Sequence, residues 1–275
     1  MKIKKSLALM ACAFGFGMSV SVAAPHWVHE YEPNAEYNSQ PDWGSIEDAS
    51  QDTIPAKYPY AECGIGTHQS PIDLSNEVNS ASLNGLSINY PKDYPDYYNT
   101  GHAPQVNVST TYSGQLKVGN DVFPLVQYHL HAPSEHIIGA TKFAAELHFV
   151  HVKADGKIAV LGVLLKVGRS NSTLDTILAY QLPLDNLGEA QHNSGPEIDP
   201  MKLLPEDKTH FYSYAGSLTT PPCSEGVSWY VLSHSVEISQ RQLDTLKSIN
   251  LANEGFDYNN RVTQGLNGRV VSGKK

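Results

Sequence analysis

The sequence predicts a single, mostly β domain, built on a large, mostly antiparallel, twisted central sheet with a few short peripheral helices. A chain of 275 residues, 40% of them apolar, can bury one substantial core. Tyrosine (15) far exceeds phenylalanine (7), and the 21 Gly and 17 Pro residues favour strands and turns over long helices.

Short segments of strand length, separated by turn signals, define the predicted sheet. They are GLSINY, QVNVSTTY, QLKV, FPLVQYHLH, FAAELHFVHV, IAVLGVLLKV and GVSWYVLSHSV. Gly119-Asn120 and Asp155-Gly156 lie where hairpin turns are expected, so FAAELHFVHV and IAVLGVLLKV should pair antiparallel. Because IAVLGVLLKV is almost continuously apolar, we expect it at the centre of the sheet with both faces covered.

Two segments are candidate helices, NSTLDTILAYQL and SQRQLDTLKSI. In the second, Ser239 is the expected N-cap, and Gln242, three residues later, is its capping-box partner. Residues 25–70 are polar and rich in Pro, Tyr and Trp, without clear periodicity, so we expect them to form an irregular segment over the surface.

The N-terminus has the features of a secretory signal peptide. Lys2, Lys4 and Lys5 precede an apolar run that is too short to span a membrane, and the small residues of 21–23 suit a cleavage site. We therefore expect residues 1–23 to be removed, and residues 24–275 to form one exported domain. A lipoprotein signal ending at Cys12 is the alternative.

The charge and the cysteine content indicate which classes of partner and which cellular compartment to expect. Loss of the three signal lysines takes the formal net charge from −9 to −12 and leaves no basic patch. This argues against nucleic acid and anionic membranes as partners. The exported chain keeps Cys63 and Cys223, which in an oxidising compartment most simply form one disulfide. Two separate buried thiols are the alternative.

Three histidines on two predicted strands form a candidate metal site. Residues two apart in a strand point to the same face, so His129 and His131 project together, and His148 lies on a strand that can pair with theirs. Three neutral ring nitrogens with an open fourth position are typical of catalytic zinc. Gln127 and Glu146, each two residues before a histidine, are placed to hold the second ring nitrogen of that histidine.

The HxH pattern alone is weak evidence, because surface strands carry such pairs by chance. The third histidine, in an ExH pattern on a neighbouring strand, strengthens it. His136 lies beyond Pro133, and His151 points to the opposite face, so we expect both to make structural hydrogen bonds.

A second informative segment is SLTTPPCSEGVSWYVL, residues 217–232. Pro221-Pro222 forms a stiff turn that would hold Thr219 and Thr220 in place. A threonine hydroxyl can accept a hydrogen bond from a metal-bound hydroxide if a carboxylate takes its own proton, and Glu135 is the candidate carboxylate. Without a metal site, TTPP is an ordinary loop.

Together, QYHLHAPSEH, AELHFVHV and SLTTPPCSEGVSWYVL resemble the α-class carbonic anhydrases. Further segments are similar to that family and follow its order over residues 26–270: QSPIDL (69–74), NTGHAPQVNV (99–108), AVLGVLLKVG (159–168) and NNRVTQGLNGR (259–269). The cysteines before QSPI and after TTPP are similar to those of the bacterial periplasmic branch.

The resemblance implies zinc-dependent, reversible hydration of CO2 to bicarbonate and a proton, by attack of zinc-bound hydroxide. Esterase side activity, inhibition by anions and sulfonamides, and a homodimer are further expectations from the family. It makes His129, His131 and His148 the Zn2+ ligands and His102 the proton shuttle. The partners of the ligands would be Gln127, Glu146 and the backbone carbonyl near Asn259.

The remaining roles also follow from the resemblance. Thr219 would be the gatekeeper that holds the hydroxide, with Glu135 accepting its proton. The backbone N–H of Thr219 and the side chain of Thr220 would bind bicarbonate and inhibitory anions. The apolar wall for CO2 would comprise Val150, Val160, Leu218, Val227 and Trp229.

Two departures from the family concern the water network. His29 stands where the family often has tyrosine, and Thr100 where it has asparagine before the shuttle. They put the rate of proton transfer in doubt, but not the hydration chemistry.

Two rival functions are weighed. His129, His131 and Glu135 also begin a cupin metal motif, but Lys142 stands where that motif needs glycine and its later PxG…H segment is absent. The second rival is a catalytically inert binding module on the carbonic anhydrase fold. Such a module would be expected to lack a ligand histidine, and all three candidates are present.

Overall fold

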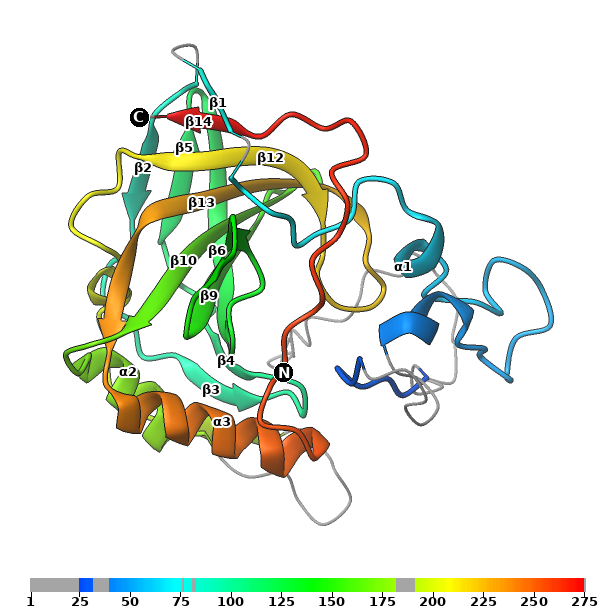
Figure 1. The fold of residues 1–275 in the computed structure, drawn as a ribbon. Helices are drawn as coiled ribbons and strands as arrows, with labels where there is room; N and C mark the ends of the chain where they lie inside the picture. The colour runs from blue at the N-terminus through cyan, green and yellow to red at the C-terminus, as the bar shows by residue number, and fades with distance from the viewer. Residues whose placement is uncertain (1–24, 32–39, 76, 81–82, 182–190, 275) are drawn as a thin grey trace, which may run out of the picture.

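The computed structural model describes residues 25–31, 40–75, 77–80, 83–181 and 191–274 (Figure 1). The predicted signal peptide lies outside these residues. The helices are α1 (Glu62–Ile65), α2 (Ser172–Ala179) and α3 (Gln240–Glu254), and the 3-10 turns are η1 (Gln40–Ser45) and η2 (Pro200–Leu203). The strands are β1 (Val78–Asn79), β2 (Leu86–Asn89), β3 (Asp96–Asn99), β4 (Pro104–Asn107), β5 (Gln115–Val118), β6 (Asp121–His131), β7 (Ile137–Ile138), β8 (Thr141–Lys142), β9 (Ala145–Val152), β10 (Ile158–Val167), β11 (Gln191–Ser194), β12 (Phe211–Ser217), β13 (Glu225–Ile238) and β14 (Ser272–Lys274). Among the described residues, no helix is long and apolar enough to cross a membrane.

One large sheet organises the molecule, in the order β1-β14-β12-β13-β10-β9-β6-β4-β3-β11, with β5 joining β6 to β2. Each of the seven predicted strand segments contributes a strand, and the predicted β9–β10 hairpin is confirmed. Most neighbours pair antiparallel, as predicted, but β10–β13 and β1–β14 are parallel, so the sheet is mixed.

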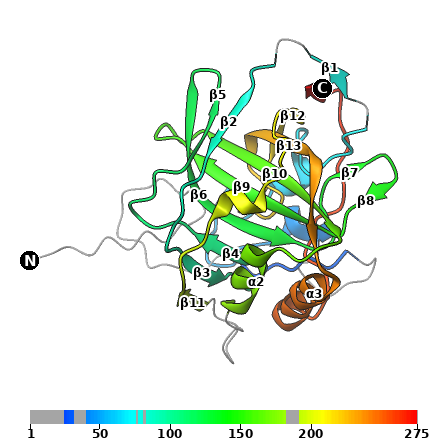
Figure 2. The same ribbon diagram turned by 90° about the vertical axis from the view of Figure 1, so that its left-hand side faces the viewer.

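Strand β10 lies at the centre with both faces covered, as its apolar sequence predicts. Leu161 and Val163 pack into one core cluster, while Val160 and Leu164 pack into another on the opposite face. Helices α2 and α3 lie side by side over the first face and contribute buried leucines to its cluster (Figure 2). The second face is free of these helices, and the candidate site lies there.

Both predicted helices form, with local signals fixing their starts. The Asn171 side chain accepts hydrogen bonds from Thr173 N and Leu174 N at the start of α2. The predicted capping box of Ser239 and Gln242 is present in α3. That helix runs to Glu254, five residues beyond the predicted segment, and ends at Gly255, whose φ of 84° suits glycine.

The N-terminal part of the described chain packs beside the sheet rather than within it (Figure 1). Trp43, Ile46 and Tyr60 form a small core of their own with Cys223. Cys63 and Cys223 form the expected disulfide, with a Cα–Cα distance of 5.0 Å. The cross-link therefore ties α1 to the turn that precedes β13.

Candidate metal centre

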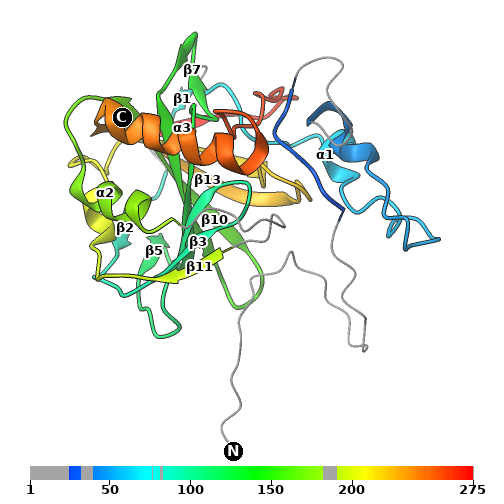
Figure 3. The same cartoon turned by 90° about the horizontal axis from the view of Figure 1, so that it is seen from below.

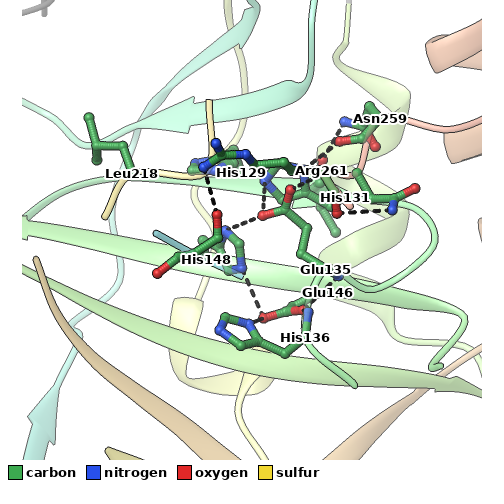
Figure 4. A network of polar contacts seen from close by, with 12 residues as sticks. His129, His131, Glu135, His136, Glu146, His148, Leu218, Asn259 and Arg261 are labelled. Carbon is green, nitrogen blue, oxygen red and sulfur yellow. Dashed lines mark hydrogen bonds and ion pairs between the residues drawn. The ribbon is translucent and has the colours of Figure 1, made fainter. Parts of the chain in front are cut away.

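The three histidines predicted to bind metal lie together on β6 and β9 (Figure 4). His129 and His148 are directly opposite in the antiparallel register, and His131 follows two residues along β6. Their ring centroids are 4.9, 5.3 and 4.7 Å apart. One ring nitrogen of each lies within 4.8 Å of the other two, a spacing that one cation could bridge.

The second ring nitrogen of each histidine is held by a hydrogen-bond acceptor. Gln127 Oε1 is 2.8 Å from His129 Nδ1, Asn259 O is 2.7 Å from His131 Nδ1, and Glu146 Oε1 is 2.9 Å from His148 Nε2. Because each contact requires an N–H on the ring, the opposite nitrogen of a neutral ring carries a lone pair. One such atom, His131 Nε2, is buried without a hydrogen-bond partner. The cluster thus fits a cation with a preference for imidazole ligands, such as Zn2+.

Burial favours the neutral form of two of these rings. Burial lowers the pKa of His129 well below its usual value, and the neighbouring histidines lower it further. For His131, burial outweighs the attraction of Glu135 and lowers the pKa to about 4. Neutral imidazole is the form that ligates metal.

Glu146 is a buried carboxylate that ties four groups together. It contacts His148 and, at 2.7 Å, Nδ1 of His136. Its second oxygen accepts the backbone N–H groups of Glu135 and His136 at 2.9 and 2.8 Å. Burial alone would raise the pKa of Glu146, but His136 and His148 hold it well below the usual range. The negative charge is therefore present where it can orient His148.

The other two histidines of this region make structural contacts, as predicted. His136 Nε2 is 2.6 Å from the hydroxyl of Tyr214. His151 lies on the opposite face of β9, where Nε2 is 2.7 Å from the hydroxyl of Tyr90 and Nδ1 is 3.1 Å from Ala159 O.

Glu135 and Thr219 are both buried, but the expected hydrogen bond between them is not found. Glu135 Oε1 accepts the backbone N–H of Arg261 at 2.7 Å. Its Oε2 is buried without a hydrogen-bond partner and lies 3.6 Å from His131 Nε2 and 3.8 Å from His148 Nδ1. Thr220, the next residue, is half-buried in the same turn.

The five residues predicted to form an apolar wall share one core cluster beside the histidines. It includes Val150, Val160, Leu218, Val227 and Trp229. Val160 pairs with Val150 on one side and with Trp229 on the other. The Trp229 ring is 4.8 Å from the His148 ring, so this apolar surface begins at the histidine cluster.

His102 lies in the loop between β3 and β4 and is joined to the site through its backbone. Its carbonyl accepts a hydrogen bond of 3.0 Å from Asn259 Nδ2, and Asn259 O in turn holds His131. The His102 side chain contacts Trp27 and Glu254. Sequence reasoning missed both partners: Trp27 lies in a segment without periodicity, and Glu254 lies beyond the predicted end of its helix.

Comparisons with known proteins agree with this geometry. The family described as eukaryotic-type carbonic anhydrase matches residues 50–275. A carbonic anhydrase of Pectobacterium atrosepticum is 35% identical over 272 residues, which cover 98% of this chain and 99% of that protein. Alpha carbonic anhydrase 4 of Arabidopsis thaliana is 38% identical over 76% of each chain. The α-carbonic anhydrase of Thermovibrio ammonificans, solved with the inhibitor sulfanilamide, superimposes with a TM-score of 0.76 at 37% identity, over 91% of this chain and 100% of that one.

These relatives decide between the alternatives that the motifs left open. The cupin reading is wrong, because both the matched family and the superimposed fold are those of carbonic anhydrases. The family match covers most of the chain, and the predicted fold is observed. The chain therefore belongs to the α-carbonic anhydrase family of enzymes.

Proposed function

We propose that this chain catalyses the reversible hydration of CO2 to bicarbonate and a proton, with Zn2+ held by His129, His131 and His148. One observation carries the proposal: each of the three rings has one nitrogen fixed by an acceptor, and one ring nitrogen of each lies within 4.8 Å of the other two. A zinc ion, when bound there, supplies the Lewis acidity that makes water nucleophilic near neutral pH.

The chain's own residues would prepare the ligands before the metal arrives. Gln127, Glu146 and the carbonyl of Asn259 fix ring orientation and tautomer, which lowers the entropy lost on binding. Three neutral imidazoles leave the ion its full positive charge, so a zinc ion held by them would be a stronger Lewis acid than one in the closed, thiolate-rich sites of structural zinc.

The apolar cluster next to the histidines would receive CO2. A linear molecule without charge gains little from polar partners, and the side chains of Val150, Val227 and Trp229 offer it a dry surface beside the metal. Thr219 would orient the attacking oxygen, and Glu135 Oε2, buried without a partner, is available to accept the threonine proton. Thr220 and the N–H of Thr219 would bind the anionic product.

Each hydration releases a proton, which His102 would carry to solvent. Imidazole suits this task because its ordinary pKa lies near neutrality, so it both takes up and releases a proton readily. Burial lowers the pKa of His102, and the neighbouring Glu254 partly offsets that effect.

Export and inhibition complete the proposal. The disulfide supports an oxidising compartment such as the periplasm. Sulfonamides are expected to bind, since the Thermovibrio ammonificans relative was solved with sulfanilamide.

CO2 hydration by the zinc-loaded protein tests the proposal, with chelator-treated protein and His148→Ala as comparisons. We expect rapid hydration that both treatments abolish. Absence of hydration in the zinc-loaded wild type would contradict the proposal and favour an inert binding module.

A further inference from the structure

Glu254 is the last residue of α3, and its side chain contacts two histidines from distant parts of the chain. Figure 3 shows the C-terminal end of α3 beside the first described segment, residues 25–31. Its Oε1 lies 2.5 Å from His102 Nδ1 and 3.0 Å from His29 Nδ1. Its Oε2 accepts the backbone N–H of His29 at 2.8 Å. The carboxylate is only 3% exposed, so these nitrogens, rather than solvent, satisfy it.

The position of this carboxylate is unfavourable in itself. The C-terminal end of a helix carries partial negative charge, so an acid there is destabilising, and its burial adds to that cost. Burial alone would raise the pKa of Glu254, but the charge of His29 and hydrogen bonds from both histidines lower it to about 2. The carboxylate therefore stays ionised although it is buried at a helix C-terminus, and such unfavourably placed charges are typical of functional sites.

Two contacts fix the ring of His102, and a third fixes its backbone. The Nδ1–H donates to Glu254, which leaves Nε2 as the nitrogen with the lone pair. The indole of Trp27 stacks on the ring at a centroid distance of 3.8 Å and an interplanar angle of 11°. Thr100 Oγ1 accepts the backbone N–H of His102 at 3.0 Å and so holds the loop.

We propose that Glu254 is a positioning residue for proton transfer: it holds His102 in one orientation and one tautomer, with Nε2 as the atom that takes up and releases the proton. The inference rests on the proposed function and adds to it a residue outside the metal cluster. In each cycle His102 Nε2 binds a proton, the imidazolium keeps its Nδ1–H bond to the Glu254 carboxylate, and Nε2 then gives the proton to buffer. Both transfers use the same nitrogen, so the ring returns to its starting tautomer.

Steady-state kinetics of Glu254→Gln in weak buffer test the proposal. Because the proton leaves after bicarbonate has formed, its transfer enters kcat and not kcat/KM. We expect kcat to fall about tenfold, within the range for residues that orient an active group, while kcat/KM stays unchanged. Added imidazole should restore kcat. Glu237→Gln, which removes a surface carboxylate paired with Arg169, should change neither constant.

A double variant separates positioning from general structural damage. If Glu254 acts through His102, then His102→Ala and the combination with Glu254→Gln should have the same kcat. An additional loss in the double variant, or an unchanged kcat in Glu254→Gln alone, would overturn the proposal.

Nitrogen NMR of the His102 ring measures its tautomer directly and so tests the positioning role independently of activity. In the zinc-loaded wild type we expect the Nδ1–H tautomer, and in Glu254→Gln a mixture of both tautomers. The same spectrum in both proteins would refute the positioning role. A wild type without CO2 hydration but with the expected tautomer shift would refute the proposed function and leave the positioning of His102 standing.

Discussion

Each candidate ligand owes its orientation to one partner, and these partners are unequally predictable from sequence. Gln127 and Glu146 lie two residues before the histidines that they contact, so strand parity is enough to find them. Asn259 holds His131 from 128 residues away, and Glu254 holds His102 from 152 residues away. No local pattern encodes contacts of that range, because they form only when the C-terminal part of the chain packs beside the sheet.

Removing the partner of one ligand should weaken metal binding without disturbing the fold. Gln127→Ala frees Nδ1 of His129, so the ring loses its fixed tautomer, and we expect zinc affinity to fall about 10- to 100-fold. Competition with a chromogenic chelator measures this change. Lys117→Ala, at an exposed position of β5, is the control and should bind zinc as the wild type does. Equal affinities in all three proteins would contradict the assigned role of Gln127.

Glu254 should also make stability depend on pH. Its pKa is about 2 in the folded protein against an ordinary value of 4.5. Since the folded pKa is the lower one, the stabilisation is complete above pH 4.5 and is lost as the pH falls through 4.5 towards 2. The contribution is at most about 3 kcal/mol. Urea unfolding across this range should therefore show a shallower loss of stability in Glu254→Gln, whereas parallel curves would exclude the carboxylate as the cause.

Among the elements, strands with a strong local pattern were predicted and strands defined by their neighbours were not. β10 and β13 are rich in branched and aromatic residues, and both were found. β12 has the sequence FYSYAGS, whose serines, alanine and glycine resemble a loop, and it becomes a strand by pairing with β13 and β14. The parallel pairing of β10 with β13 was also unforeseen, because it brings together segments far apart in the chain.

Gly162 in β10 lies close to the carboxylate of Glu146, which contacts His148. A Cβ at this position would lie 3.1 Å from Glu146 Oε1 and 3.2 Å from a methyl carbon of Val231. Gly162→Ala should therefore displace Glu146 and destabilise the protein by about 1–3 kcal/mol, the usual cost of overpacking. Zinc affinity should fall in the same variant. In Gly85→Ala the added Cβ meets only the end of Lys274 at 3.6 Å, so a matching loss there would point to a general effect of the substitution.

For the molecule as a whole, the disulfide joins the N-terminal cluster to the sheet. It spans 160 residues, and the closing of so long a loop stabilises the folded chain by about 5 kcal/mol at most. Cys63→Ser with Cys223→Ser should therefore lower the free energy of unfolding by about 2–5 kcal/mol. Chemical unfolding of the oxidised and double-serine proteins checks this value. Equal stabilities would mean that packing around Trp43 already fixes this part of the chain.

Asn259 gives the site a dependence on the completeness of the chain. Its side chain binds Leu130 O, Ala132 N and His102 O, and its carbonyl holds His131. A nascent or truncated chain that stops before this residue already contains all three histidines. It lacks the hydrogen bonds of Asn259 that orient His131 and hold the loop of His102. If the three histidines bind zinc as proposed, a chain that ends before Asn259 should bind it more weakly than the full-length protein does.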